Sequence, residues 1–271
     1  MKPLISVIIP AYNDASTLEM AVDSICAQTY TNLEIIIIDD KSTDDTRNVA
    51  QAYASKDKRV KYFQVQENDP YRVNRIGVNI NAGYSARNLG VEKARGDIIT
   101  FQDADDVSYA NRIEVQFDLL EKYNAMHAVV DYGHLEGSGE QYIGKTLPVN
   151  LDTVEVLGFK DITKLVKENK PIPQWLRDPS SYRPVNTLPV RLLKRLGRKL
   201  FWRDIAPYPC SGNTAMVRRE VFNEIRFRPL WERTRPSRKG RGADMDFNYA
   251  VAERFGKSVA IKASLYLWYT S

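Results

Sequence analysis

The chain has 271 residues, of which 43% are hydrophobic, so it is long enough for one large α/β domain or two small ones. This composition excludes a disordered tail and a small disulfide-stabilised protein. The charge is uneven: residues 176–241 carry 17 Lys and Arg against 5 Asp and Glu, a net charge of +12, whereas the rest of the chain carries −7. We therefore expect an N-terminal domain followed by an irregular basic region.

We expect neither a membrane-spanning protein nor a secreted one. No apolar run approaches the roughly 18 residues of a membrane span, and residues 1–3 lead into a strand pattern without a signal-peptide core. We expect a cytoplasmic protein. The cysteines and histidines, Cys26, Cys210, His127 and His134, lack the spacing of a zinc site, so a metal would bind oxygen ligands.

Short β-branched runs alternate with amphipathic stretches up to about residue 135. The runs predict strands over residues 4–9, 33–38, 60–65, 98–102 and 128–132. The amphipathic stretches predict helices over residues 16–28, 44–55, 84–95, 109–123 and 244–255. Ser16 and Glu19 have capping-box spacing and predict the start of the first helix. Strand–helix–strand units of this length predict an α/β fold with a mostly parallel sheet.

Carboxylates follow three of the predicted strands. Asp14 follows the first strand, Asp39 and Asp40 end the second, and the fourth runs into Asp103-Ala104-Asp105-Asp106. Because ligands of open parallel sheets bind beyond the carboxyl ends of the strands, these loops predict a ligand site. Asp103 and Asp105 suit Mg²⁺ or Mn²⁺, which prefer oxygen ligands and leave positions for substrate phosphates.

Some of these acidic groups also have a purely structural interpretation. Asp106 or Ser108 could cap the helix over 109–123, and Ser42 could cap the helix over 44–55. Asp39 or Asp40 does not fit a cap, and either could accept a hydrogen bond from a base or a ribose.

Two residues near helix starts also have both a structural and a functional interpretation. Arg87, one turn into its helix, either faces a diphosphate or is solvated. Asp244 is either a helix cap or a general base for a sugar hydroxyl.

These motifs resemble, in this order, the inverting nucleotide-sugar glycosyltransferases of family two, which have the GT-A fold. The matching segments are residues 6–13, 39–44, 86–97 and 101–106, with weaker matches at 212–222 and 243–256. The resemblance implies a Rossmann-like, mostly parallel sheet flanked by helices, with an irregular basic C-terminal acceptor region. It implies a nucleotide-sugar-binding half, residues 1–140, and an acceptor-binding and catalytic-base half, residues 141–271, in one continuous domain.

The resemblance also implies roles for individual residues in a donor site. It places Pro10, Ala11 and Tyr12 beside the nucleotide base, Asp40 on the base edge, Arg87 at the base or diphosphate, Asp103 near the ribose and metal, Asp105 as the direct ligand of Mn²⁺ or Mg²⁺, and Asp244 as the catalytic base. The family usually has an acidic residue before this base, where the chain has Ala243, so Asp246 is the alternative base.

The implied activity is metal-dependent, inverting transfer of a single sugar from a nucleoside-diphosphate sugar to a hydroxyl of a glycan or lipid-linked acceptor, as in polysaccharide biosynthesis. UDP is the commonest nucleotide of the family. Processive members carry a Gln-x-x-Arg-Trp string after the base and membrane helices, neither of which this sequence has, so we expect one sugar per encounter.

Three alternatives remain open at this stage. A nucleotidyltransferase would have a Gly-rich loop after the first strand, where residues 10–14 contain no glycine. A non-catalytic binding module would leave Asp103, Asp105 and Asp244 unexplained. An inactive glycosyltransferase homologue would bind nucleotide without turnover.

Residues 190–203 have an amphipathic basic pattern, with leucines on one face and Arg and Lys on the other. They form either a surface helix packed on the domain or a peripheral contact with the inner face of an anionic membrane, where a lipid-linked acceptor would lie. The basic loop over 231–242 could close on the diphosphate, hold an acidic acceptor or be solvated. Nucleic acid is not expected, because the basic run lacks a recognition motif.

Overall fold

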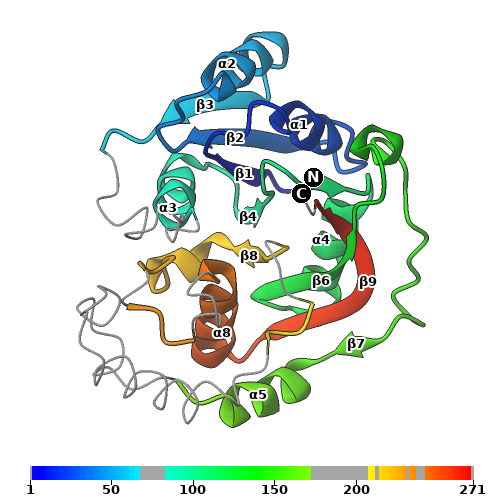
Figure 1. Cartoon of the computed structure of the whole chain (residues 1–271). Coiled ribbons are helices and arrows are strands. Elements are labelled where there is room, and N and C mark those ends of the chain that lie inside the picture. The colour runs from blue at the N-terminus through cyan, green and yellow to red at the C-terminus, as the bar shows by residue number, and fades with distance from the viewer. Residues whose placement is uncertain are drawn as a thin grey trace, which may run out of the picture.

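A computed structural model of the chain describes residues 2–67, 83–171, 207–210, 214–229, 232–235 and 242–269. Within these residues, nine strands form one mixed sheet with helices on both faces (Figure 1). The strand order is β3-β2-β1-β4-β8-β6-β9-β5, and β7 pairs with β9 at the side.

The elements have the following bounds. The strands are β1 (Ile5–Ala11), β2 (Leu33–Asp39), β3 (Val60–Gln64), β4 (Ile98–Phe101), β5 (Val107–Ser108), β6 (His127–His134), β7 (Val156–Leu157), β8 (Met216–Arg218) and β9 (Ser258–Trp268). The described helices are α1 (Leu18–Cys26), α2 (Thr46–Lys56), α3 (Tyr84–Lys93), α4 (Arg112–Tyr123), α5 (Phe159–Glu168) and α8 (Ala243–Phe255), with the 3₁₀ turns η1 (Gly139–Tyr142) and η3 (Arg219–Asn223). All five predicted strands and all five predicted helices are confirmed, with small shifts at their ends.

Strand β1 lies at the centre of a parallel block, paired with β2 on one side and β4 on the other, while β3 extends the block beyond β2. Strand β8 is antiparallel to both β4 and β6, so β6 and its parallel neighbour β9 run in the same direction as β1. Every residue of β2 is buried. This burial on both faces explains its uninterrupted isoleucine run.

Each face of the sheet has its own apolar layer. Helices α1, α2 and α4 pack against the face that carries Ile5, Val7 and Ile9 of β1. Helices α3, α5 and α8 pack against the face that carries Ile8 of β1 and Ile36 of β2. The alternation along β1 therefore assigns helices to opposite faces of the sheet.

The predicted capping box of the first helix is wrong. Helix α1 begins at Leu18, its N-cap is Thr17, and no side-chain cap hydrogen bond forms. The carbonyl of Asp14 instead accepts hydrogen bonds from the backbone N–H groups of Thr17 and Leu18. A turn held by this carbonyl therefore replaces the cap expected at Ser16.

The predicted caps of two later helices are also wrong. Helix α4 begins after Asn111, whereas Asp106 directly precedes the short strand β5 and Ser108 lies within it. Helix α2 begins after Asp45, and the Ser42 hydroxyl accepts a hydrogen bond from the N–H of Asn13 instead. The side chains of Ser42, Asp106 and Ser108 therefore do not cap these helices.

The predicted amphipathic helix over 190–203 lies outside the described residues. Within the described part of the chain, no helix combines the length and the apolar composition that crossing a membrane requires.

Glu34 of β2 is a buried carboxylate that connects the first three strands to the loop before β4. Its side chain accepts hydrogen bonds from the Ser6 hydroxyl at 2.6 Å, from Lys61 Nζ at 2.8 Å and from Arg95 Nε at 3.1 Å, and the residue is 2% exposed. Burial alone would raise its pKa, but the hydrogen bonds from Lys61, Ser6 and Arg95 outweigh burial and lower the pKa to about 2.

Glu34→Gln is expected to lower the free energy of unfolding by about 2 kcal/mol at pH 7, because charge-assisted hydrogen bonds are lost. The folded-state pKa lies below the ordinary value, so the stabilisation is present above about pH 4.5 and disappears as the pH falls towards about 2. Urea denaturation at pH 7 and pH 3 measures both effects.

The partly exposed carboxylate Glu114, which pairs with the exposed Lys2, is the control. Glu114→Gln should cost less than about 1 kcal/mol, as exposed ion pairs do. Equal losses for the two variants at pH 7 would contradict a special role for Glu34.

Candidate active site

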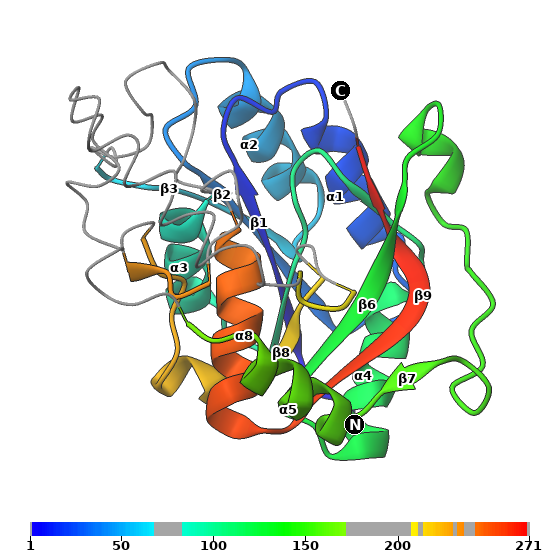
Figure 2. The same cartoon turned by 60° about the horizontal axis from the view of Figure 1, so that its bottom comes forward.

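The candidate site lies at the carboxyl edge of the parallel block. Ala11 at the end of β1 is in register with Asp39 of β2, and Ile8 of β1 is in register with Phe101 at the end of β4. The loops that follow the three strands are therefore neighbours in space. Figure 2 shows the amino-terminal end of α8 at this same edge.

Three carboxylates gather after β4. The carboxylate oxygens of Asp103, Asp105 and Asp106 lie within 4.8 Å of one another. Burial, followed by the charges of Asp103 and Asp105, raises the pKa of Asp106 to about 8. Burial and the charge of Asp14 also raise the pKa of Asp105. An all-oxygen set whose negative charges repel one another fits a hard divalent cation such as Mn²⁺ or Mg²⁺.

Asp14 is a fourth carboxylate at this edge, and no role was assigned to it from the sequence. Burial raises its pKa to about 6, despite a hydrogen bond from the backbone N–H of Tyr12, and the charges of Asp103 and Asp44 add to the rise. Asn13, in the left-handed conformation with φ 58°, turns the chain between Tyr12 and Asp14. The signal was its place three residues after β1, at the same edge as the other acidic loops.

Arg87 and Asp103, both predicted site residues, meet in the structure. Arg87 Nη2 lies 2.6 Å from Asp103 Oδ1, and Arg87 is 4% exposed. Gly83, with φ 64°, precedes α3, and a Cβ at this glycine would lie 2.7 Å from Arg87 Nη1. Only glycine therefore fits both the backbone and the space beside this guanidinium.

Two acidic residues at the end of β2 differ in their contacts. Asp39 is fully buried and accepts hydrogen bonds from the Ser42 N–H, the Tyr62 hydroxyl and the Gln64 amide. Asp40 is 3% exposed, and its backbone N–H donates to the carbonyl of Ala11 at 2.8 Å. The contacts of Asp39 give it a structural role, while contact of Asp40 with a base stays a prediction.

Asp244 and Asp246 lie in the first turn of α8 and have different surroundings. Asp246 is 1% exposed and accepts hydrogen bonds from Arg228 Nε at 2.8 Å, from the Thr234 N–H at 2.7 Å and from the Arg235 N–H at 2.9 Å. Asp244 is partly exposed, and within the described residues its carboxylate has no hydrogen bond or ion pair. Asp246 therefore connects Arg228, Thr234 and Arg235 to α8, and Asp244 is the more accessible of the two carboxylates.

An aromatic stack connects the start of α8 to Arg87. The ring of Phe247, one turn after Asp244, stacks on Phe227 with centroids 4.2 Å apart. The guanidinium carbon of Arg87 lies 5.7 Å from the centroid of the Phe227 ring. Phe101 at the end of β4 packs edge-on against Phe227 at 5.0 Å. The first turn of α8 is thereby fixed relative to the end of β4 and to the Arg87–Asp103 pair.

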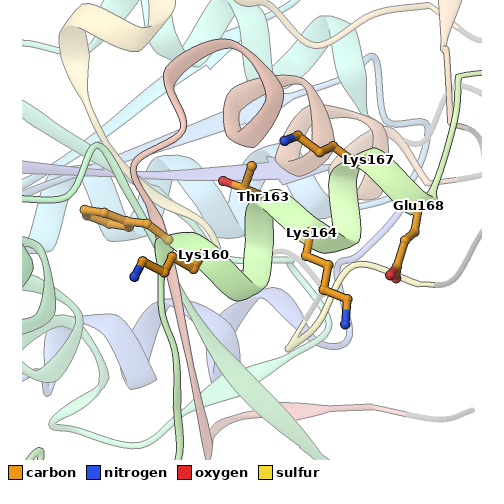
Figure 3. A pocket seen from close by; sticks show the side chains of 6 residues that line it. Lys160, Thr163, Lys164, Lys167 and Glu168 are labelled. Atoms are coloured by element: carbon orange, nitrogen blue, oxygen red, sulfur yellow. The ribbon is translucent and has the colours of Figure 1, made fainter.

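Helix α5 carries a separate surface hollow of about 520 Å³, lined by Phe159, Lys160, Thr163, Lys164, Lys167 and Glu168 (Figure 3). All these side chains come from one helix, so the hollow is a shallow basic surface. A second hollow, of about 310 Å³, lies between α5 and the carboxyl-terminal part of α8. The residues that line these hollows include none of the carboxylates after β1, β2 and β4 and none from the first turn of α8, so neither hollow is the carboxylate site. Figure 2 shows α5 beside α8.

Comparisons with known proteins identify the family and the fold. An uncharacterised glycosyltransferase of Rickettsia conorii is 38% identical over 136 residues, which are 50% of this chain and 20% of that protein, so the chain spans about a fifth of its length. Staphylococcus aureus TarS residues 1–349, solved with UDP-GlcNAc, is 16% identical, with a TM-score of 0.57 over 100% of this chain and 59% of that one. Glucosyl-3-phosphoglycerate synthase of Mycobacterium tuberculosis, solved with Mn²⁺ and UDP, is 17% identical, with a TM-score of 0.54 over 99% and 73% of the two chains.

These structural likenesses confirm the predicted GT-A fold. The family model described as glycosyl transferase family 2 matches residues 6–226, which is most of the chain. The chain therefore belongs to glycosyltransferase family 2.

Proposed function

We propose that the chain catalyses metal-dependent, inverting transfer of a single sugar from a nucleoside-diphosphate sugar, with UDP as the first nucleotide to test. The acceptor is a hydroxyl of a glycan or lipid-linked molecule in polysaccharide biosynthesis. The main support for the proposal is that Asp103, Asp105 and Asp106 lie close together at the carboxyl edge of the parallel block, with Arg87 paired to Asp103. The family match favours this activity over the nucleotidyltransferase alternative.

The donor side of the proposed site is built from the residues after β1, β2 and β4. Pro10, Ala11 and Tyr12 flank the base and Asp40 binds its edge, while Asp103 and Asp105 hold Mn²⁺ or Mg²⁺. When bound, the ion supplies positive charge that stabilises the departing nucleoside diphosphate. Arg87, buried beside Asp103, places a second positive charge at the diphosphate.

The Asp244 carboxylate takes the proton of the acceptor hydroxyl while the hydroxyl oxygen forms a bond to the anomeric carbon. In the same displacement the bond from that carbon to the diphosphate breaks, so the configuration inverts. The partial exposure of Asp244 leaves it accessible to an acceptor, whereas hydrogen bonds from Arg228, Thr234 and Arg235 occupy Asp246, the alternative base.

Two solved relatives support the choice of ligands. The TarS structure contains UDP-GlcNAc, and the glucosyl-3-phosphoglycerate synthase structure contains Mn²⁺ and UDP. We propose the same kinds of ligand for this chain because its acidic side chains lie at the carboxyl edge of a sheet of the same fold. In this proposal residues 1–140 bind the donor, and residues 141–271 supply the base and bind the acceptor.

Calorimetric titration with UDP, GDP, dTDP and CDP, with and without Mn²⁺, tests the donor site. We expect one nucleotide to bind only in the presence of Mn²⁺, and Asp105→Ala to weaken that binding at least about 10-fold, because a charged metal ligand is lost. Asp152→Ala, in an exposed surface ion pair, is the control and should bind as wild type does. If no nucleotide binds under either condition, the proposed function is wrong.

Asp244→Asn should lower the rate of nucleoside-diphosphate release from the matching nucleotide sugar by about 10²-fold or more, because general-base catalysis is removed. Its melting temperature and Mn²⁺-dependent nucleotide affinity should stay at the wild-type values. Asp246→Asn should instead lower the melting temperature, because a buried set of hydrogen bonds is weakened. Full activity of Asp244→Asn, with a folded but inactive Asp246→Asn, would reverse the assignment of the base.

A cytoplasmic location with peripheral membrane contact through residues 190–203 also stays a prediction, because this segment lies outside the described residues. Leu196→Glu combined with Leu200→Glu should abolish co-sedimentation with vesicles that contain anionic lipid, since it removes the apolar face. Wild-type co-sedimentation of the double variant would contradict membrane contact through this segment.

A further inference from the structure

Tyr266 of β9 connects the end of the chain to the carboxylate loop after β4. Its hydroxyl oxygen accepts a hydrogen bond from the backbone N–H of Asp103 at 3.0 Å and donates to Asp106 Oδ2 at 2.7 Å. The backbone N–H of Tyr269 donates to the other oxygen of Asp106 at 2.8 Å. Tyr266 is 2% exposed. The first and last residues of the Asp103–Asp106 loop are therefore held by one strand end.

A buried cation lies on the ring of this tyrosine. Arg112 of α4 is fully buried, and its guanidinium carbon lies 5.7 Å from the centroid of the Tyr266 ring. Arg112 Nη1 donates to the Thr100 hydroxyl and to the Gln116 amide oxygen, and no carboxylate in the described part of the chain pairs with Arg112. Burial lowers its pKa to about 10, so the guanidinium stays charged at pH 7. The ring of Tyr266 is thus fixed by packing as well as by its hydroxyl.

The three carboxylates of the loop differ in their exposure and in the hydrogen bonds that they accept. Asp106 is 2% exposed and both of its oxygens accept hydrogen bonds from β9 and the residue that follows it. The Asp103 side chain is 25% exposed, and Asp105 is also partly exposed. Asp103, whose Oδ1 pairs with Arg87, and Asp105 are therefore still partly open to an ion from solvent, whereas both oxygens of the buried Asp106 are directed at Tyr266 and Tyr269.

We propose that Tyr266 is a positioning residue for the metal-binding loop, and that Asp106 anchors this loop to β9 without being a metal ligand. The inference rests on the proposed function, because it concerns the shape of the same site. Fixing both ends of a four-residue loop restricts the two exposed carboxylates before an ion arrives. This lowers the entropic cost of assembling the site.

Tyr266→Phe removes only the hydroxyl and leaves the ring on Arg112. It frees the Asp103 N–H and one oxygen of Asp106, so the loop relaxes and Mn²⁺ affinity in the presence of the bound nucleotide should fall by about 10-fold or more. The matched control is Tyr30→Phe, because Tyr30 is 1% exposed and its hydroxyl donates to the Pro3 carbonyl at 2.6 Å, before the start of β1.

Calorimetric Mn²⁺ titration and thermal melting of both variants separate positioning from stability. We expect both to lower the melting temperature, and only Tyr266→Phe to lose Mn²⁺ affinity. Wild-type Mn²⁺ affinity in Tyr266→Phe, or an equal loss in Tyr30→Phe, overturns the inference. If wild-type protein shows no Mn²⁺-dependent nucleotide binding, the proposed function fails instead.

A second pair of variants tests the role of Asp106 and does not depend on the folding of Tyr266→Phe. Asp106→Asn keeps the shape of the side chain and a polar partner for Tyr266, so Mn²⁺ affinity should stay within about threefold of wild type, whereas Asp105→Asn should lose about 10-fold or more. Equal losses in the two variants would make Asp106 a ligand and overturn the inference.

Discussion

The parallel register of β1, β2 and β4 is the constraint on which the site depends. Because these neighbouring strands run in one direction, the loops after them must meet at one edge, however far apart they lie in the sequence. That edge collects Asp14, Asp40 and the Asp103–Asp106 loop. A reversal of any of the three strands would move its acidic loop to the opposite end of the sheet.

Burying several carboxylates in one place costs free energy: burial first, and then the charges of neighbouring carboxylates, raise the pKa values of Asp14, Asp105 and Asp106. The fold offsets part of it with Arg87 beside Asp103 and with hydrogen bonds from the end of β9 to Asp106. The remaining negative charge is what makes the edge suited to a divalent cation and the phosphates that accompany it. The same carboxylates therefore repel one another in the free protein and together attract the ion in the proposed complex.

Hydrophobic periodicity predicted the parallel block well, because buried strands and amphipathic helices leave local patterns. Helix starts were predicted poorly, since the Asp14 carbonyl competes with the Ser16 side chain, and Asp106 contacts β9 instead of a helix. The choice between Asp244 and Asp246 needed the structure, because the donors to Asp246 come from residues 228–235. Tyr266 had no local signal at all: its partners lie about 160 residues earlier, and only the folded sheet brings them together.

The central claim is that the loop after β4 holds a metal ion together with a nucleoside diphosphate. A crystal structure of the chain with Mn²⁺ and UDP, recorded with anomalous scattering at the manganese edge, tests it most directly. We expect one strong anomalous peak bonded to Asp105, with Asp103 nearby and the diphosphate oxygens completing the coordination. A peak at another place in the fold, or a nucleotide bound away from the carboxyl edge of β1, β2 and β4, would contradict it.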